Sequence, residues 1–256
     1  MNLTALQLAE TMADHAREVI APYFRSGLNI ADKADDSPVT IADQNTEAAL
    51  RQMLADHFPD HNIIGEEHAN VDQGSEYTWV IDPIDGTRAF VSGMPTFGTL
   101  ICQLKYNRPQ LGIIDIPMIG DRWVAEAGNG VTFNGQPCAV STQKSIDQAT
   151  LYCTDPDMFV GEQPAQFARV EKAVKLRRFG GDCYSYGLLA AGHVDLIVEA
   201  DLKVYDVMAL IPVIEEAGGI ITDWQGNPLT SEDWDGCALA AATPELHQQA
   251  MALLNQ

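Results

Sequence analysis

The chain has 256 residues, of which 46% are hydrophobic, and it carries a formal net charge of −21 at pH 7. This length allows one large domain or two fused halves, since single hydrophobic cores stop growing at about 250–300 residues. The negative charge argues against nucleic acid as a partner, because phosphate backbones attract Lys and Arg. It has two interpretations: a surface that keeps the protein soluble, or carboxylates that are clustered to hold cations.

Cysteine usage and the N-terminus indicate the compartment. The five cysteines are isolated and form neither a CxxC pair nor a Cys/His zinc pattern, which suits a reducing cytosol. The first twenty residues lack the basic segment and apolar core of a signal peptide. No apolar run approaches the roughly 18 residues that a membrane span needs. The sequence therefore predicts a soluble cytoplasmic protein without a membrane partner.

Apolar spacing predicts helices and strands that mix along the whole chain. Helices are expected over residues 3–25, 42–57, 164–175, 183–191, 206–217 and 244–254. Strands are expected over 78–82, 97–106, 110–117, 121–128, 150–153 and 194–199, and turn residues favour antiparallel pairing in the middle of the chain. Residues 58–76 have the composition of a loop. We expect one domain with two halves, about 1–145 and 146–256, that meet at a turn-rich boundary.

Two aspartates, Asp82 and Asp85, end an apolar run in the stretch WVIDPIDGT. Pro83 prevents a regular continuation of the strand and Gly86 permits a tight turn, so one interpretation is a strand that simply ends in a turn. The apolar run indicates burial, however, where unpaired carboxylates are costly and repel one another. A divalent cation removes both objections, and ligands that are all oxygens select hard cations such as Mg²⁺.

A two-metal site for phosphate esters needs further carboxylates. Glu66 and Glu67 lie just upstream in the stretch IIGEEH, where the alternative is a solvated surface pair. Asp206 begins a helical pattern that ends in Gly-Gly. Its alternative role is that of an N-cap, at a helix end that also attracts anions.

Pro212 lies inside this expected helix and should kink it or remove one hydrogen bond.

These motifs together resemble the inositol monophosphatase superfamily of magnesium-dependent, lithium-sensitive phosphatases. The resemblance is carried by GEE, WVIDPIDGT, and a Tyr-Asp pair that heads a helix ending in EEAGG, and it extends to SPVTIADQNTE near the start. Within this superfamily the chain is more similar to histidinol-phosphate phosphatases, through DPIDGTRAFVSGMPTFGTLI, GGIITDW and the stretch over residues 177–215. The broad family usually carries Trp-Asp where this chain has Tyr205–Asp206, which bears on inositol phosphate specificity and keeps the aspartate.

The resemblance implies a layered α-β-α-β-α sandwich, a homodimer, and two or three Mg²⁺ ions in each active site. Glu66 and Asp82, with the Ile84 carbonyl, would hold the first ion. Asp82, Asp85 and Asp206 would hold the second, and a third, weaker ion would depend on Glu66.

The resemblance also implies the residues that act on the substrate. Asp43 and Thr87 would orient and deprotonate the attacking water, and Glu67 would act behind the metal ligands. Gly86 and Thr87 would offer backbone amides to the phosphate. Thr40 is the expected N-cap of the helix over 42–57 with Asp43 as its capping-box partner, and Asp43 can serve both roles. Attack by metal-activated water in line with the phosphorus needs no phosphoenzyme.

The expected substrate is histidinol phosphate, a phosphate monoester of histidine biosynthesis that carries an ammonium and an imidazole. Asp182 and Glu199 would line its pocket, because paired carboxylates favour a cation. Inositol phosphatases tend to have a small residue at the position of Asp182, whose alternative role is to cap the helix expected from Cys183. Arg88 is expected to bind phosphate, or a carboxylate across a subunit boundary.

Other functions remain open at this point. Another phosphatase of the same superfamily would act on inositol 1-phosphate or a nucleotide 3′-phosphate. A noncatalytic module that binds divalent metal is a candidate from another class. A dinucleotide-binding protein is excluded, because no G-x-G-x-x-G follows a strand.

Overall fold

The computed structural model describes residues 3–26, 31–32, 38–39, 41–232 and 234–256. The helices of these ranges are α1 (Ala5–Ile20), α2 (Ile41–His57), α3 (Thr87–Ser92), α4 (Gln163–Ala173), α5 (Asp182–Ala190), α6 (Val204–Val207), α7 (Leu210–Glu216) and α8 (Pro244–Leu254), with 3₁₀ turns at Ile146–Gln148 and Pro156–Met158. The helices expected over 3–25, 42–57, 164–175, 183–191 and 244–254 are confirmed to within a few residues at their ends.

The strands form two large sheets and one short hairpin. The hairpin pairs β1 (Ala31–Asp32) with β2 (Pro38–Val39). The seven-stranded sheet contains β3 (Asn62–Gly65), β4 (Tyr77–Asp85), β5 (Gly98–Lys105), β6 (Arg108–Ile116), β7 (Asp121–Glu126), β8 (Gly130–Phe133) and β9 (Gln136–Pro137), in that order. The five-stranded sheet contains β10 (Thr150–Cys153), β11 (Leu176–Phe179), β12 (Leu196–Glu199), β13 (Ile220–Thr222) and β14 (Ala238–Ala241), in the order β11-β10-β12-β14-β13.

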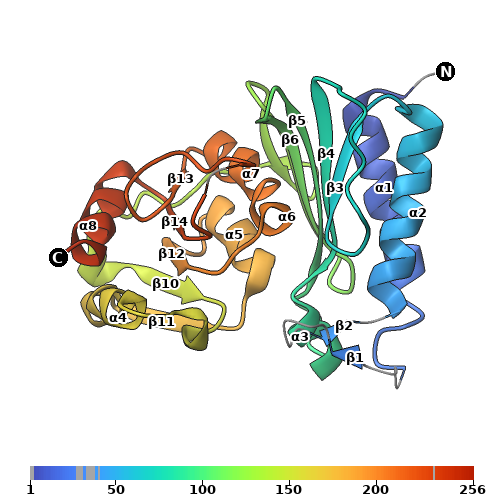
Figure 1. Ribbon diagram of the computed structural model, residues 1–256. Helices are drawn as coiled ribbons and strands as arrows, with labels where there is room; N and C mark the ends of the chain where they lie inside the picture. Colours follow the sequence, from blue (N-terminus) through green and yellow to red (C-terminus); the bar gives the residue numbers. More distant parts are fainter. Residues whose placement is uncertain (1–2, 27–30, 33–37, 40, 233) are drawn as a thin grey trace.

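Helices and sheets alternate in five layers (Figure 1). α1 and α2 cover the outer face of the seven-stranded sheet, α5, α6 and α7 lie between the two sheets, and α4 and α8 cover the outer face of the five-stranded sheet. Three clusters of buried apolar side chains fill the spaces between the layers. The predicted α-β-α-β-α sandwich is therefore confirmed.

The seven-stranded sheet is antiparallel from β4 to β9, as the turn residues predicted. β3 adds to it as a parallel edge strand beside β4, which corrects the expectation of a loop over residues 58–76. β3 has only four residues, a run too short for a period of two to be visible. Its place matters because the chain leaves it directly into Glu66.

The helix expected over 206–217 is divided into α6 and α7, which confirms the interruption that Pro212 suggested. Pro212 is the third residue of α7, where the missing N–H has no intrahelical acceptor to lose. The junction between α6 and α7 packs closely on β6. A Cβ atom placed on Gly112 of β6 would lie only 2.2 Å from the Ala209 carbonyl oxygen, so no side chain fits there. Gly112 thereby lets the middle layer approach the seven-stranded sheet.

β11, β13 and β14 lie in segments without an expected strand. β11 is an edge strand whose four side chains are all exposed, and β14 contains only Ala and Leu. Neither has the alternation or the β-branched residues that indicate a strand in sequence. Within the described part of the chain, no helix is both long and apolar enough to cross a membrane.

Candidate active site

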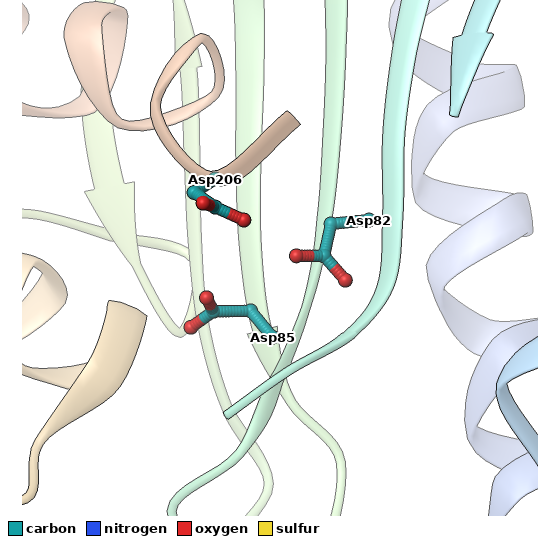
Figure 2. A group of neighbouring side chains, drawn as sticks. All are labelled: Asp82, Asp85 and Asp206. Carbon is teal, nitrogen blue, oxygen red and sulfur yellow. The ribbon is translucent and has the colours of Figure 1, made fainter. Parts of the chain in front are cut away.

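Three aspartate side chains from two layers converge at the end of β4 (Figure 2). Asp82 and Asp85 belong to β4 of the seven-stranded sheet, and Asp206 belongs to α6 of the middle layer. Each offers one carboxylate oxygen, and these three oxygens lie within 4.8 Å of one another. The structure thus brings together the three aspartates that the sequence predicted as ligands of one metal ion.

An irregularity in β4 places Asp82 and Asp85 on the same side. Residues three apart in a regular strand point to opposite faces of the sheet. Pairing with β5 is regular up to Asp82, then shifts in register and resumes at Asp85. Within the shift, the Ile84 amide donates to Asp82 Oδ1 at 3.0 Å and Thr99 Oγ1 donates to the Pro83 carbonyl at 2.8 Å. The shift acts as a bulge that turns both carboxylates toward one point.

The cluster cannot carry its full negative charge without compensation. Burial, followed by the charge of Glu66, raises the pKa of Asp82 well above its ordinary value. Burial, followed by the charges of Asp182 and Asp206, does the same to the pKa of Asp85. Crowded, desolvated carboxylates of this kind either hold protons or bind a cation. The all-oxygen donor set fits a hard divalent ion such as Mg²⁺.

Asp206 occupies the third position of α6 and is not its N-cap, which corrects that alternative. Its Oδ2 accepts a hydrogen bond from the backbone amide of the N-cap residue, Lys203, at 2.7 Å. The side chain of Asp206 thereby satisfies one of the amides at the N-terminal end of α6. Burial raises the pKa of Asp206 to about 7, although this hydrogen bond opposes the shift.

Glu66 and Asp43 lie beside the cluster. The charge of Glu66 raises the pKa of both Asp82 and Asp206, and the charge of Asp43 raises that of Asp82. Glu66 follows β3, and Asp43 is buried in the first turn of α2. Thr40, the expected N-cap of this helix, lies outside the described residues.

Thr87 and Gly86 begin α3 immediately after the cluster. Gly86 has a left-handed backbone with φ of 83°, and Thr87 Oγ1 donates to the Ile84 carbonyl at 3.2 Å. A Cβ on Gly86 would lie 2.8 Å from the Asp182 carboxyl carbon, so a larger residue would collide with Asp182. The turn therefore needs glycine both for its conformation and for its space.

Asp182 holds an uncommon backbone conformation, with φ of 44°. It is the first residue of α5 and the N-cap is Gly181, so Asp182 does not occupy the N-cap position that its alternative role required. Left-handed backbone at a residue other than glycine is strained and is often retained at functional positions. Burial raises the pKa of Asp182 to about 6, and the charge of Arg88 opposes the shift.

Arg88 contacts a carboxylate of its own chain. Its Nη1 donates to Asp155 Oδ2 at 2.8 Å. The expected contact with phosphate, or with a carboxylate across a subunit boundary, stays a prediction. The side chain is mostly exposed at the rim of the cavity described next.

Two adjoining cavities open beside the aspartates. The outer one, of about 410 Å³, is lined by Gly86, Thr87 and Arg88 and by four aspartates, Asp155, Asp157, Asp182 and Asp201. The inner one, of about 110 Å³, is lined by Asp85 and Asp206 and by Glu199. Asp182 lines both cavities and Glu199 lines the inner one, so both residues lie close to the aspartate cluster.

Glu199 is a buried carboxylate held by two donors. Its Oε1 accepts the Thr154 amide and its Oε2 accepts the Tyr186 hydroxyl, each at 2.8 Å. Burial raises the pKa of Glu199 to about 7, and both hydrogen bonds oppose the shift.

The sequence interpretation missed Thr154, Asp155, Asp157 and Tyr186. A signal for the first three was present, because an acidic TDPD stretch follows the expected strand over 150–153. Tyr186 had no such signal, since an aromatic residue inside an apolar helix is typical of a core position.

Several known proteins are similar to this chain in sequence or in fold. Residues 2–256 match the model of the inositol monophosphatase family. The chain is 42% identical to bifunctional phosphatase IMPL2, chloroplastic, from Arabidopsis thaliana, over 96% of this chain and 74% of that protein. It is 37% identical to a histidinol-phosphatase of Chlorobaculum parvum over 86% of each chain. A solved structure of an inositol monophosphatase from Zymomonas mobilis matches with a TM-score of 0.90 and 40% identity, over 99% of this chain and 100% of that one. The chain therefore belongs to the inositol monophosphatase family.

Proposed function

We propose that this protein is a Mg²⁺-dependent phosphatase that hydrolyses histidinol phosphate to histidinol and phosphate. Membership of a family of metal-dependent phosphatases supports the reaction class. The observation that carries the substrate choice is the acidic outer cavity beside the three aspartates.

The metal ligands in this proposal are those of the acidic cluster. Glu66, Asp82 and the Ile84 carbonyl would hold one Mg²⁺, and Asp82, Asp85 and Asp206 a second, with a third, weaker ion at Glu66. When bound, Mg²⁺ supplies Lewis acidity and lowers the pKa of a coordinated water. The convergence of the three aspartate oxygens and the proximity of Glu66 support these assignments.

The protein's own groups would handle the water and the phosphate. Asp43 and Thr87 would orient the attacking water and accept its proton, while Glu67 would support the loop behind Glu66. The first amides of α3, at Gly86 and Thr87, would donate to phosphate oxygens, because the first N–H groups of a helix have no intrahelical acceptor. No side chain needs to act as a nucleophile, so no phosphoenzyme forms.

Charge selects the substrate. Two of the four aspartates of the outer cavity are paired, Asp155 with Arg88 and Asp201 with Lys203. Asp157 and Asp182 leave the described lining with a net negative charge, and Glu199 adds a carboxylate deeper in. A substrate that carries an ammonium or imidazolium group would be stabilised there, whereas inositol is neutral and gains nothing from this charge.

A second candidate is inositol 1-phosphate. The solved structure from Zymomonas mobilis, 40% identical to this chain, is described as an inositol monophosphatase, and this favours that substrate. A nucleotide 3′-phosphate and a noncatalytic metal-binding role complete the alternatives.

The deciding experiment measures phosphate released from histidinol phosphate, inositol 1-phosphate and a nucleotide 3′-phosphate at equal concentrations, with Mg²⁺ and with excess chelator. We expect histidinol phosphate to have the highest kcat/KM and all turnover to stop in chelator and return with Mg²⁺. A higher kcat/KM for inositol 1-phosphate would overturn the substrate. Full turnover in chelator would overturn the metal site, and no turnover of any ester would favour the binding module. Light scattering of the same preparation would test the predicted homodimer.

A further inference from the structure

Behind the proposed metal centre lies an ion pair that no step of the reaction uses. Glu47 and Arg51 stand on α2, one and two turns beyond Asp43. Residues four apart on a helix share a face, so Asp43, Glu47 and Arg51 all point toward the same side of α2. The Glu47 side chain is 0% exposed and the Arg51 side chain 13% exposed, and Arg51 Nε donates to Glu47 Oε1 at 2.7 Å.

Each member of the pair grips the backbone that follows Glu66. Glu47 Oε2 accepts the Glu67 amide at 2.7 Å, and Glu47 Oε1 accepts the His68 amide at 3.2 Å. Arg51 Nη2 donates to the His68 carbonyl and Arg51 Nη1 to the Ala69 carbonyl, each at 3.0 Å. One carboxylate and one guanidinium therefore fix four backbone groups over residues 67–69. We call this set of contacts the α2 clamp.

The same pair also packs against Gly65, which precedes Glu66, and leaves no room there for a side chain. A Cβ placed on Gly65 would lie 2.2 Å from Glu47 Oε1 and 2.8 Å from Arg51 Nη2. Its backbone is not left-handed, so this glycine is needed for space alone. The clamp accounts for the glycine of the GEE motif: it packs closely against the backbone before Glu66 and is hydrogen-bonded to the backbone after it.

We propose that the α2 clamp is a positioning device that holds Glu66 against the aspartate cluster at a fixed distance from Asp43. The groups that it grips flank Glu66 directly, and the helix that carries it also carries Asp43. A rigid helix thereby sets the spacing between the residue proposed to accept the proton of water and a proposed metal ligand. This inference rests on the proposed Mg²⁺ site, and it assigns Glu47 and Arg51 no contact with substrate or metal.

The test measures Mg²⁺ binding by titration calorimetry, without substrate, in Glu47→Gln. This variant keeps the volume of the side chain but replaces an acceptor oxygen with an amide group that opposes a backbone N–H. We expect the Kd for Mg²⁺ to rise about tenfold or more, as is typical when groups that orient metal ligands are removed. Hydrogen exchange of the backbone over residues 66–69 should accelerate, and a high Mg²⁺ concentration should restore most of kcat because every ligand is intact.

Two controls separate positioning from general loss of stability. Arg122→Gln breaks another buried ion pair, to Asp115, and should lower the melting temperature without changing the Kd for Mg²⁺. Asp56→Asn changes an exposed residue of the same helix, α2, and should change neither. Arg51→Lys keeps the charge but cannot span all three acceptors, and should give a smaller rise in Kd; it replaces Glu47→Gln if that variant does not fold.

The outcomes distinguish this inference from the function on which it rests. Wild-type protein that binds no Mg²⁺ would refute the proposed metal site and the clamp together. Wild-type binding with an unchanged Kd in Glu47→Gln, or an equal rise in Arg122→Gln, would refute the clamp alone.

Discussion

The seven-stranded sheet buries carboxylates in two regions, and it compensates them in different ways. On β6, Asp115 is 0% exposed and accepts Arg122 Nε at 2.6 Å and Arg17 Nη2 at 3.0 Å. On β4, Asp82 and Asp85 meet each other, Asp206 and Glu66, and the side chains that act most strongly on the pKa of Asp82 are all acidic. The first region takes its positive charge from arginines of the protein itself. The second has to be balanced by bound protons or by a cation from solution, and this need distinguishes a candidate site from a structural ion pair.

Removing a carboxylate from the second region should have the largest effect. We expect Asp206→Asn to lower kcat/KM at least about a thousandfold, because a lost metal ligand removes several kcal/mol of transition-state stabilisation. The metal-free variant should also melt at a higher temperature than metal-free wild type, since one of the repelling charges is gone. Phosphate-release kinetics and thermal melts in chelator test both parts. A lower melting temperature with unchanged turnover would place Asp206 with Asp115 as a structural residue.

The matching change in the first region should act on stability and spare activity. Arg122→Ala leaves the buried Asp115 with Arg17 as its remaining partner. Breaking a buried ion pair of this kind costs about 3 kcal/mol of the free energy of unfolding. Urea denaturation measures this loss, and kcat/KM in saturating Mg²⁺ should be that of wild type. A tenfold loss of kcat/KM in the folded variant would contradict the separation of the two regions.

Asp182 tests how far the second region extends toward substrate. Asp182→Asn removes the charge and keeps a residue that tolerates φ of 44°. A charge-assisted hydrogen bond contributes roughly 1.5–3 kcal/mol, so kcat/KM for histidinol phosphate should fall about 10- to 100-fold. Turnover of a small neutral-alcohol phosphate should change little. Equal losses on both substrates would show that Asp182 does not recognise the cation.

Glu199 should give the smallest effect, as a pH dependence. Its pKa is raised to about 7, so the carboxylate is ionised above that pH and neutral below it. Because an ammonium group pairs with the ionised form, KM for histidinol phosphate should rise as pH falls through 7, while KM for a neutral-alcohol phosphate should not. Tyr186→Phe removes a donor that lowers this pKa and should move the rise to higher pH. A pH profile that is identical for the two substrates would remove Glu199 from recognition.

Much of the site was visible in sequence, because its strongest motifs are local. WVIDPIDGT contains two of the three clustered aspartates, and the search for further carboxylates pointed to Glu66 and Asp206. The similarity to known phosphatases supplied their roles as metal ligands and the layered fold. In the structure, a register shift in β4 turns the two aspartates of this stretch to the same side, and no periodicity in the sequence indicates that shift. The left-handed backbone of Asp182 was equally invisible, since a helix N-cap and a strained pocket residue have the same letter in sequence.

What sequence reasoning could not supply depends on contacts between distant segments. The pair of Arg88 with Asp155 joins α3 to the loop after β10. The α2 clamp joins a helix to a loop some twenty residues later, and Glu47 looks like an ordinary helix residue until Gly65 is seen to make room for it. The short strands β11 and β14 form because neighbouring strands offer them partners, and their own residues favour the strand state only weakly.

The close approach of the α6–α7 junction to Gly112 would couple the docking of two layers to the binding of a metal ion. Asp206 reaches the other two aspartates only while the α6–α7 junction stays docked on β6. A divalent ion bound by all three aspartates would link the middle layer to the seven-stranded sheet. Because the ion would bind only the docked state, its binding would stabilise that state. Separation of these layers would remove Asp206 from the ion, so the interface would melt and the ion would be released in one cooperative process.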